Sequence, residues 1–176
     1  MALISFPARL NAWAEQSPDA AAVTCGASTV TRSELQSEGR RLGRELQHLG
    51  VEHGDFVTVA LPNSVEWFIT YVACWNIGAI PQPVSARLPA RELAAIVELA
   101  DSTVVVGAPD SAMSMLPASI HHLAIGHRSS PDYSDDPLPD STSPAWKAPT
   151  SGGSTGRPKL IVSGDPAIYD TEAPLP

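Results

Sequence analysis

The chain of 176 residues carries a formal net charge of −8, and 43% of its residues are apolar. This length and composition are typical of a globular protein with a buried core, and they exclude a disordered chain. The negative charge argues against nucleic acids and anionic membrane surfaces as partners, because both repel an acidic protein.

Residues 1–50 predict a helix, a hairpin and a second helix. Two short strands flank Gly26, which is typical of a hairpin. Thr31 and Glu34 have the spacing of a capping box at the start of the second helix. Gly39 lies on the apolar face of that helix, which indicates close backbone packing. The expected bounds are 7–15 for the first helix, Ala21–Cys25 and Ser28–Thr31 for the strands, and Thr31 to Gly50 for the second helix.

From residue 55 onward, strands alternate with helices. A strand buried on both faces is expected at 55–61, and an apolar helix at 65–77 with Asn63 as its cap. Pro81 and Pro83 each remove a hydrogen-bond donor, so the strand at 80–84 should be short or lie at an edge. A helix opening at Pro89, a strand at 103–106, a short helix at 112–116 and a strand at 122–125 follow. This order predicts an α/β domain whose mostly parallel sheet is covered by helices.

Composition divides the chain into four segments. Residues 1–127 form the α/β unit, and residues 128–145 are rich in Pro, Ser and Asp without an apolar period, which indicates a surface loop. Residues 146–163 are expected to contain a strand at 146–148, a glycine-rich loop and a strand at 160–162. Residues 164–176 form an acidic, proline-containing tail that should be extended or disordered.

The glycine-rich loop combines the residue types that bind phosphate. Glycines let the backbone approach an anion closely, and successive N–H groups in such a turn form a concave nest for phosphate oxygens. Arg157 and Pro158 separate the last glycine from the lysine, which excludes a Walker-type loop. A flexible Gly/Ser linker is the alternative that composition alone allows. The residues expected to bind the phosphates of ATP are Ser151, Gly152, Gly153, Ser154, Thr155, Gly156 and Lys159.

The run from Ser151 to Lys159 resembles the phosphate loop of the AMP-forming adenylate superfamily, which includes acyl-CoA synthetases, luciferases and nonribosomal-peptide adenylation domains. It departs from that pattern at Gly152, where a second hydroxyl is usual, and at Leu160, where glycine often follows the lysine. Residues 78–84, 88–93 and 100–106 resemble the first α/β subdomain of the same family. The resemblance therefore covers nearly the whole chain.

The resemblance implies an ATP-dependent acid–CoA ligase. A carboxylic acid would attack the α-phosphate of ATP, pyrophosphate would leave, and the acyl group of the adenylate would pass to coenzyme A. The loop would stabilise the charge on the departing pyrophosphate, with Mg²⁺ bridging the phosphates. No carboxylate of the sequence is assigned to that metal.

The family also has features that this sequence lacks. Its members carry an adenine segment, a ribose-binding Asp, a hinge and a domain with a catalytic lysine, and too few residues follow Val162 to hold them. We therefore expect the front portion of a ligase that is inactive alone, with apolar surface near 57–61 or 160–162 that the remainder of the ligase or a partner covers. A non-catalytic remnant that serves as a binding or regulatory module is the alternative.

Other candidate sites are less specific. His121, His122 and His127 suggest a metal, but neighbouring residues on a strand point to opposite faces and converge poorly on one ion. The acidic residues at 132–136 lack the spacing of a calcium-binding EF-hand. A solvated acidic loop is therefore expected there.

The remaining residues of note favour structural roles. Cys25 and Cys74 fit no metal spacing and are expected to be reduced, buried thiols of a cytoplasmic protein. The four tryptophans are expected to pack in the core. The longest apolar stretch is too short to span a bilayer, and the N-terminus lacks the basic start of a signal peptide.

Overall fold

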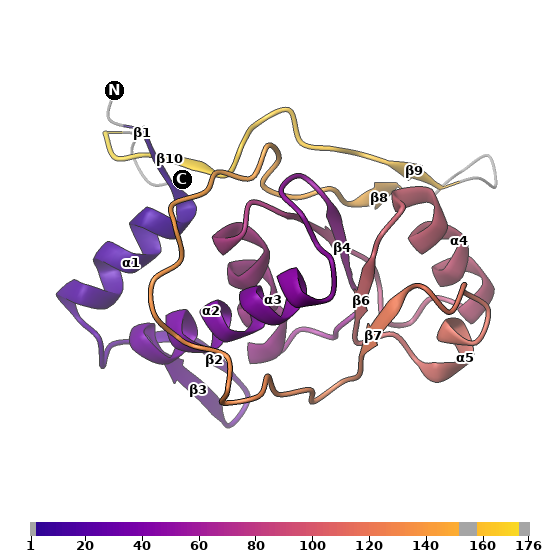
Figure 1. Ribbon diagram of the computed structural model, residues 1–176, viewed down its shortest axis with the longest axis horizontal. Coiled ribbons are helices and arrows are strands. Elements are labelled where there is room, and N and C mark those ends of the chain that lie inside the picture. Colours follow the sequence, from indigo (N-terminus) through magenta and orange to yellow (C-terminus); the bar gives the residue numbers. More distant parts are fainter. Residues whose placement is uncertain (1–2, 152–157, 173–176) are drawn as a thin grey trace.

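The computed structural model describes residues 3–151 and 158–172 (Figure 1). Its central feature is a four-stranded sheet in the order β5-β4-β6-β7, in which all neighbouring strands run parallel. The α/β class with a parallel sheet is therefore confirmed. The elements are β1 Leu3–Ser5, α1 Phe6–Gln16, β2 Ala21–Cys25, β3 Ser28–Thr31, α2 Arg32–His48, β4 Phe56–Val59, α3 Val65–Asn76, β5 Ile80–Pro83, α4 Ala90–Ala100, β6 Val104–Val106, α5 Asp110–Met113, β7 His121–Leu123, β8 Thr150–Ser151, β9 Lys159–Leu160 and β10 Ile168–Asp170.

Helices cover both faces of the sheet. Figure 1 shows α1, α2 and α3 on one side of the strands, and α4 and α5 on the other. Val57, Val59 and Val104 pack in one apolar cluster with α2 and α3, whereas Ala60 and Val105 pack in a second cluster with α4 and α5. Successive residues of a strand face opposite sides, so this alternation places the sheet between two helical layers.

The central strand β4 is buried on both faces, as its sequence predicted. Val57, Thr58 and Val59 are each 0% exposed. The expectation of exposed apolar surface at 57–61 is therefore wrong, because α3 and α4 lie against this strand from opposite sides. Leu61 is also buried.

Strand β5 lies at an edge of the sheet, as its prolines predicted. Ile80 N donates to Asp55 O, just before β4, at 2.8 Å, and Val84 N donates to Val59 O at the end of β4 at 3.0 Å. Pro81 and Pro83 alternate with them and so occupy the outward-facing positions, where a missing N–H costs no bond in the ladder. The outward carbonyl of Pro81 instead accepts from Ala148 N at 3.0 Å.

Helix α2 begins with the predicted capping box. Thr31 N donates to Glu34 Oε2 at 2.8 Å, and Glu34 N donates to Thr31 Oγ1 at 3.2 Å. Gly39 lies where α2 packs against α3, and a Cβ placed on it would stand 2.7 Å from Val72 Cγ1. The close backbone packing predicted at Gly39 is confirmed.

Helix α3 is buried on most of its surface, in agreement with its apolar sequence. Its cap is Ser64 and not Asn63. The Ser64 hydroxyl accepts from Trp67 N at 3.3 Å, and its backbone is extended as an N-cap requires. The predicted cap is wrong by one residue because Asn63 precedes this turn, where its carbonyl accepts from the Cys25 thiol.

The two ends of the described chain meet. β10 pairs antiparallel with β1, with Leu3 opposite Asp170 and Ser5 opposite Ile168. Part of the tail expected to be extended or disordered is thus a paired strand, because β1 supplies the backbone partners. The predicted hairpin of β2 and β3 is confirmed.

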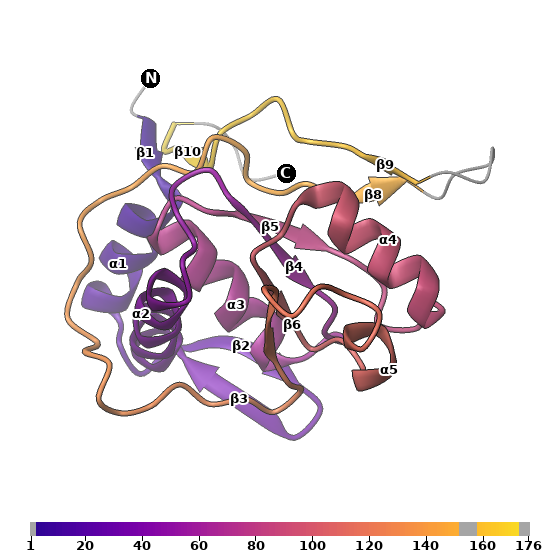
Figure 2. The ribbon, with the colours of Figure 1, turned by 45° about the vertical axis from the view of Figure 1, so that its right-hand side comes forward.

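Residues 124–149 form no helix or strand and cross the surface past α2 (Figure 2). Asp135 fixes this crossing, since its carboxylate accepts from the Ser37 hydroxyl and from Arg41 Nη2 at 2.7 Å. The Ser37 hydrogen bond, with the charge of Arg41 beside it, holds the pKa of Asp135 below its usual value. The four-segment division of the chain stays a prediction.

Several element bounds differ from those predicted. α5 and β7 both begin before the predicted positions. No strand forms at 146–148, because Pro81 and Pro83 offer no outward N–H groups to a neighbouring strand. The short strands β8 and β9 take the place of those expected at 146–148 and 160–162.

Candidate functional site

The hairpin of β8 and β9 brackets the predicted phosphate loop. Thr150 lies opposite Leu160, and Ser151 lies opposite Lys159, in an antiparallel pair. The predicted phosphate-binding residues that the structure describes are therefore brought face to face. Five further predicted residues fall outside the described part of the chain and stay predictions: Gly152, Gly153, Ser154, Thr155 and Gly156.

The two faces of this hairpin have different environments. Directly opposed residues of an antiparallel pair project from the same face, and the next pair projects from the other. Leu160 packs against the apolar cluster at Ile80, and Thr150 accepts a hydrogen bond from Gln82. This face therefore lies on the sheet, and the face that carries Ser151 and Lys159 points away from it.

Lys159 is exposed, and within the described residues its ammonium has no hydrogen bond or ion pair. The Ser151 hydroxyl likewise has no partner among the residues that the structure describes. A cation beside a free hydroxyl offers charge and a donor to an anion. The two side chains therefore fit a phosphate group.

The segments that flank the hairpin hold each other in place. Trp75 Nε1 donates to Trp146 O at 2.9 Å, and Trp146 N donates to Asp165 O at 3.1 Å. Ser163 N donates to Lys147 O at 3.1 Å. Figure 2 shows β8 and β9 beyond β5, next to α4. These contacts join the segments before β8 and after β9 to each other and to helix α3.

Apolar side chains just after β9 are exposed. Ile161 and Val162 are 52% and 48% exposed. The expectation of exposed apolar surface at 160–162 is therefore confirmed for these two residues.

A polar row that sequence reasoning missed runs from the sheet to the hairpin. The Thr58 hydroxyl donates to Gln82 Oε1 at 2.5 Å and lies 2.8 Å from Ser102 Oγ, and Gln82 Nε2 donates to Thr150 Oγ1 at 3.2 Å. Thr58 and Gln82 are 0% exposed, and Ser102 is 2% exposed. Polar residues inside strands otherwise built from apolar ones were the signal that could have revealed this row.

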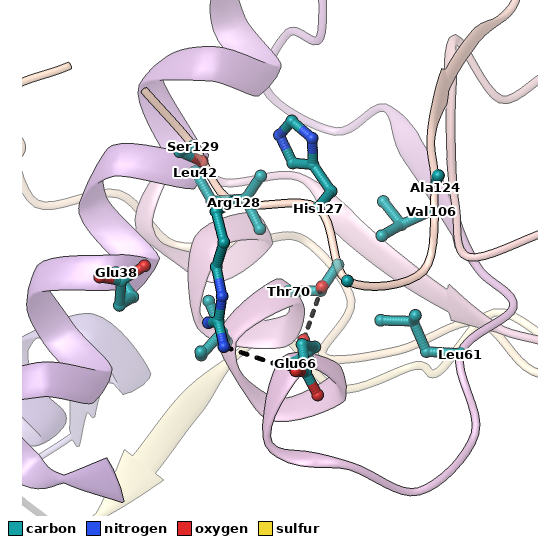
Figure 3. Close-up of a pocket in the computed structure, with 12 residues that line it drawn as sticks. Glu38, Leu42, Leu61, Glu66, Thr70, Val106, Ala124, His127, Arg128 and Ser129 are labelled. Atoms are coloured by element: carbon teal, nitrogen blue, oxygen red, sulfur yellow. Dashed lines mark hydrogen bonds and ion pairs between the residues drawn. The ribbon is translucent and has the colours of Figure 1, made fainter. Parts of the chain in front are cut away.

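A small cavity lies between α2, α3 and the segment after β7 (Figure 3). Arg128 Nη2 stands 3.7 Å from Glu66 Oε1, and Thr70 Oγ1 donates to Glu66 O at 2.8 Å. A hydrogen bond from its own backbone N–H, then the Ser64 hydroxyl and the charge of Arg128, lower the pKa of Glu66. The cavity volume is about 30 Å³, which suits water and not a nucleotide.

A larger groove of about 340 Å³ lies between α1, β2, α2 and α3. Its walls are mainly apolar, and they include Trp13, Phe68 and Trp75. In Figure 1, three of the elements that line it, α1, β2 and α2, lie on the left of the molecule, whereas β8 and β9 lie on the right. This groove therefore does not contribute to the candidate phosphate site.

The other candidate residues are dispersed. His127 Nε2 stands 2.9 Å from Glu45 Oε2, whereas His121 is exposed. No group of three or more His, Cys, Asp or Glu side chains suited to a metal ion occurs in residues 3–151 and 158–172. Cys25 and Cys74 are both free thiols, but only Cys74 is fully buried, so the expectation of two buried thiols holds for one.

The tryptophans pack together as expected only in part. Trp67 stacks on Tyr71 with a ring separation of 3.8 Å, and Tyr71 meets Trp75 edge to face. Each of the four tryptophans, Trp13, Trp67, Trp75 and Trp146, stays partly exposed.

Among the described residues, none of the helices has the length and apolar run needed to cross a bilayer.

Comparison with known proteins defines the family. Residues 10–168 match the family described as AMP-binding enzyme, and the chain belongs to it. The chain is 31% identical over 158 residues to a feruloyl-CoA synthase of an Amycolatopsis species, which covers 88% of this chain and 32% of that protein. It is 30% identical over 151 residues to malpibaldin synthetase of Mortierella alpina, over 84% of this chain and 3% of that protein.

Solved structures share the fold. The nonribosomal peptide synthetase FmoA3 matches with a TM-score of 0.78 and 24% identity, over 92% of this chain and 17% of that one. The N-terminal domain of FACL13 from Mycobacterium tuberculosis matches with a TM-score of 0.75 and 23% identity, over 90% of this chain and 44% of that one. The chain thus has the fold of the N-terminal subdomain of adenylate-forming enzymes, and it spans about a third or less of the two curated relatives named above.

Proposed function

We propose that this chain is the N-terminal portion of an AMP-forming acid–CoA ligase. The enzyme would activate a carboxylic acid with ATP, release pyrophosphate, and transfer the acyl group from the adenylate to the thiol of coenzyme A, with AMP as the second product. The observation that carries the proposal is the opposed pair of Ser151 and Lys159 on the outward face of the β8–β9 hairpin. Membership of the AMP-binding enzyme family and the relation to feruloyl-CoA synthase support it.

In this proposal the hairpin binds the β- and γ-phosphates. Negative charge accumulates on these groups when the carboxylate attacks the α-phosphorus and the bond to pyrophosphate breaks. Lys159 supplies a fixed positive charge, and Ser151 supplies a hydroxyl donor beside it. Donors that are already in place before the reaction stabilise this developing charge most effectively. Mg²⁺ would neutralise phosphate charge when bound, and no described carboxylate is assigned to hold it.

Titration calorimetry with pyrophosphate and with ATP tests the phosphate site directly. We expect Lys159→Ala to weaken pyrophosphate binding about tenfold or more, and Lys159→Arg to retain most of it, because a charge-assisted hydrogen bond contributes roughly 1.5–3 kcal/mol. Lys147→Ala is the matched control. It removes the same charge from a lysine that lies over the Trp146 ring. Equal binding by the Lys159 and Lys147 variants would reject the assignment.

A second acceptor is favoured by a specific observation. The fold matches FmoA3, a nonribosomal peptide synthetase, and the sequence is similar to malpibaldin synthetase. We propose as the alternative that the acceptor thiol belongs to a carrier domain and not to coenzyme A. Trapping the acyl-thioester formed by the complete enzyme with each acceptor separates the two.

We further propose that residues 1–176 make no acyl-adenylate by themselves. The motivation is the small share of each relative that the chain spans. The assay is pyrophosphate exchange into ATP with a panel of carboxylic acids. Exchange above background would show that these residues form a complete catalyst, whereas phosphate binding without exchange would agree with a portion of one. If the chain shows neither phosphate binding nor exchange, the result would favour the alternative of a non-catalytic binding or regulatory module.

A further inference from the structure

We propose that Gln82 is a positioning residue for the phosphate-binding hairpin. Its amide joins Thr58 in the centre of the sheet to Thr150 in β8, and it thereby fixes the face on which Ser151 and Lys159 are presented. This inference rests on the proposed function, because it concerns how the same site is held. The inference gives a role in phosphate binding to residues that do not themselves contact phosphate.

Both polar ends of the Gln82 amide have a hydroxyl partner. The side chain is 0% exposed, and Oε1 accepts from the hydroxyl of Thr58, which is also 0% exposed. Nε2 then points outward, and its contact within the described residues is Thr150 Oγ1 at 3.2 Å. A buried amide strongly favours the geometry that satisfies its polar atoms. The amide therefore acts as a rigid link between sheet and hairpin.

The hairpin needs such a link because its own ladder is short. β8 and β9 contribute two residues each, and β8 is not part of the main sheet. An isolated two-stranded hairpin is marginally stable in water. The prolines of β5 offer no N–H groups to β8, so a backbone ladder cannot take over this role. Beyond the single backbone bond from Ala148 N to Pro81 O, the Gln82 side chain supplies the connection from β5 to β8 itself.

The register of the hairpin determines its chemistry. A shift of one residue turns every side chain to the other face. Such a shift would direct Lys159 toward the sheet and Leu160 toward solvent. The Gln82 bond to Thr150, together with the packing of Leu160 against the Ile80 cluster, selects the register that exposes the cation.

Two substitutions at Thr150 test the link. Thr150→Val keeps the shape of the side chain and removes the acceptor, whereas Thr150→Ser keeps the hydroxyl. Loss of one hydrogen bond should weaken pyrophosphate binding about three- to tenfold in Thr150→Val, and Thr150→Ser should restore it. Thr58→Val breaks the other end of the link. It should also weaken pyrophosphate binding, although Thr58 lies in the sheet and not in the hairpin. The inference would be overturned if Thr150→Val bound pyrophosphate with the same affinity as the unsubstituted chain.

A second measurement needs no ligand and separates this inference from the proposed function. Backbone amide exchange at Ser151 and Lys159 should be faster in Thr150→Val than in the unsubstituted chain and slow again in Thr150→Ser. Exchange at Val57 in the sheet is the internal control and should not change. If the unsubstituted chain binds no pyrophosphate but exchange follows this pattern, the proposed function is wrong and the positioning role stands. Unchanged exchange at both hairpin residues would refute the positioning role.

Discussion

Alanine substitution at Gly107 should destabilise the fold far more than the same change at Gly126. The two glycines have nearly the same backbone angle, with φ of +83° at Gly107 and +81° at Gly126. A Cβ on Gly107 would stand 2.4 Å from Leu61 Cδ2 and 3.1 Å from Leu61 N, whereas a Cβ on Gly126 meets nothing within 4 Å. The pair therefore separates steric contact from backbone strain.

The expected magnitudes follow from these two contributions. A left-handed backbone costs a residue with a Cβ roughly 1–2 kcal/mol, which is the full expectation for Gly126→Ala. Overpacking against Leu61 adds roughly 1–3 kcal/mol, so Gly107→Ala should lose about 2–5 kcal/mol. Urea unfolding gives the two free energies, and a melting temperature roughly 2–12 °C lower for Gly107→Ala than for Gly126→Ala is the matching thermal result. Equal free energies in the two variants would refute the reasoning, because the contact with Leu61 would then contribute nothing.

Three more predictions concern other parts of the fold. Glu66 has a pKa below its ordinary value of 4.5, so its contribution to stability is present above that pH and is lost as the pH falls through the lower folded-state pKa. Glu66→Gln should therefore be less stable than the unsubstituted chain at pH 7 and equally stable in strong acid, as measured by urea unfolding across pH. Burial raises the pKa of the Cys74 thiol, so a thiol reagent should label half-buried Cys25 first in the native state, as peptide mapping would show. Gly39→Ala should destabilise the chain by contact with Val72, and urea unfolding should show a smaller loss in a Val72→Ala background, because that change removes the Cγ1 contact at 2.7 Å and leaves the Cβ contact at 3.2 Å.

The sequence predicted most of the features that depend on neighbouring residues. The capping box at Thr31 and Glu34 forms because both partners lie within one turn of helix. The parallel sheet follows from alternating apolar strands and helices, and Pro81 marks an edge strand because its missing N–H has the same effect in any context. At the start of α3, however, Asn63 and Ser64 are both good caps, and only the backbone of the folded turn decides between them.

Features that depend on distant partners could not be predicted. Strand β10 exists because β1 lies beside it, and nothing in the tail sequence reveals that partner. The same limit applies to the candidate site. The composition of the loop predicted Ser151 and Lys159, but the role of Gln82 depends on a residue from the central strand and another from β8. Those contacts become visible only when the chain is folded.

The prolines of β5 also bear on how this protein avoids aggregation. An outer strand with free N–H and C=O groups can recruit strands from other molecules. At one border of the sheet, Pro81 and Pro83 leave no outward donors, and the Pro81 carbonyl is already occupied by Ala148 N. At the opposite border, β7 is only three residues long, and the exposed His121 is one of them. Both borders of the sheet are therefore poor templates for intermolecular β-pairing, so concentrated solutions of this chain should resist fibril formation through the sheet.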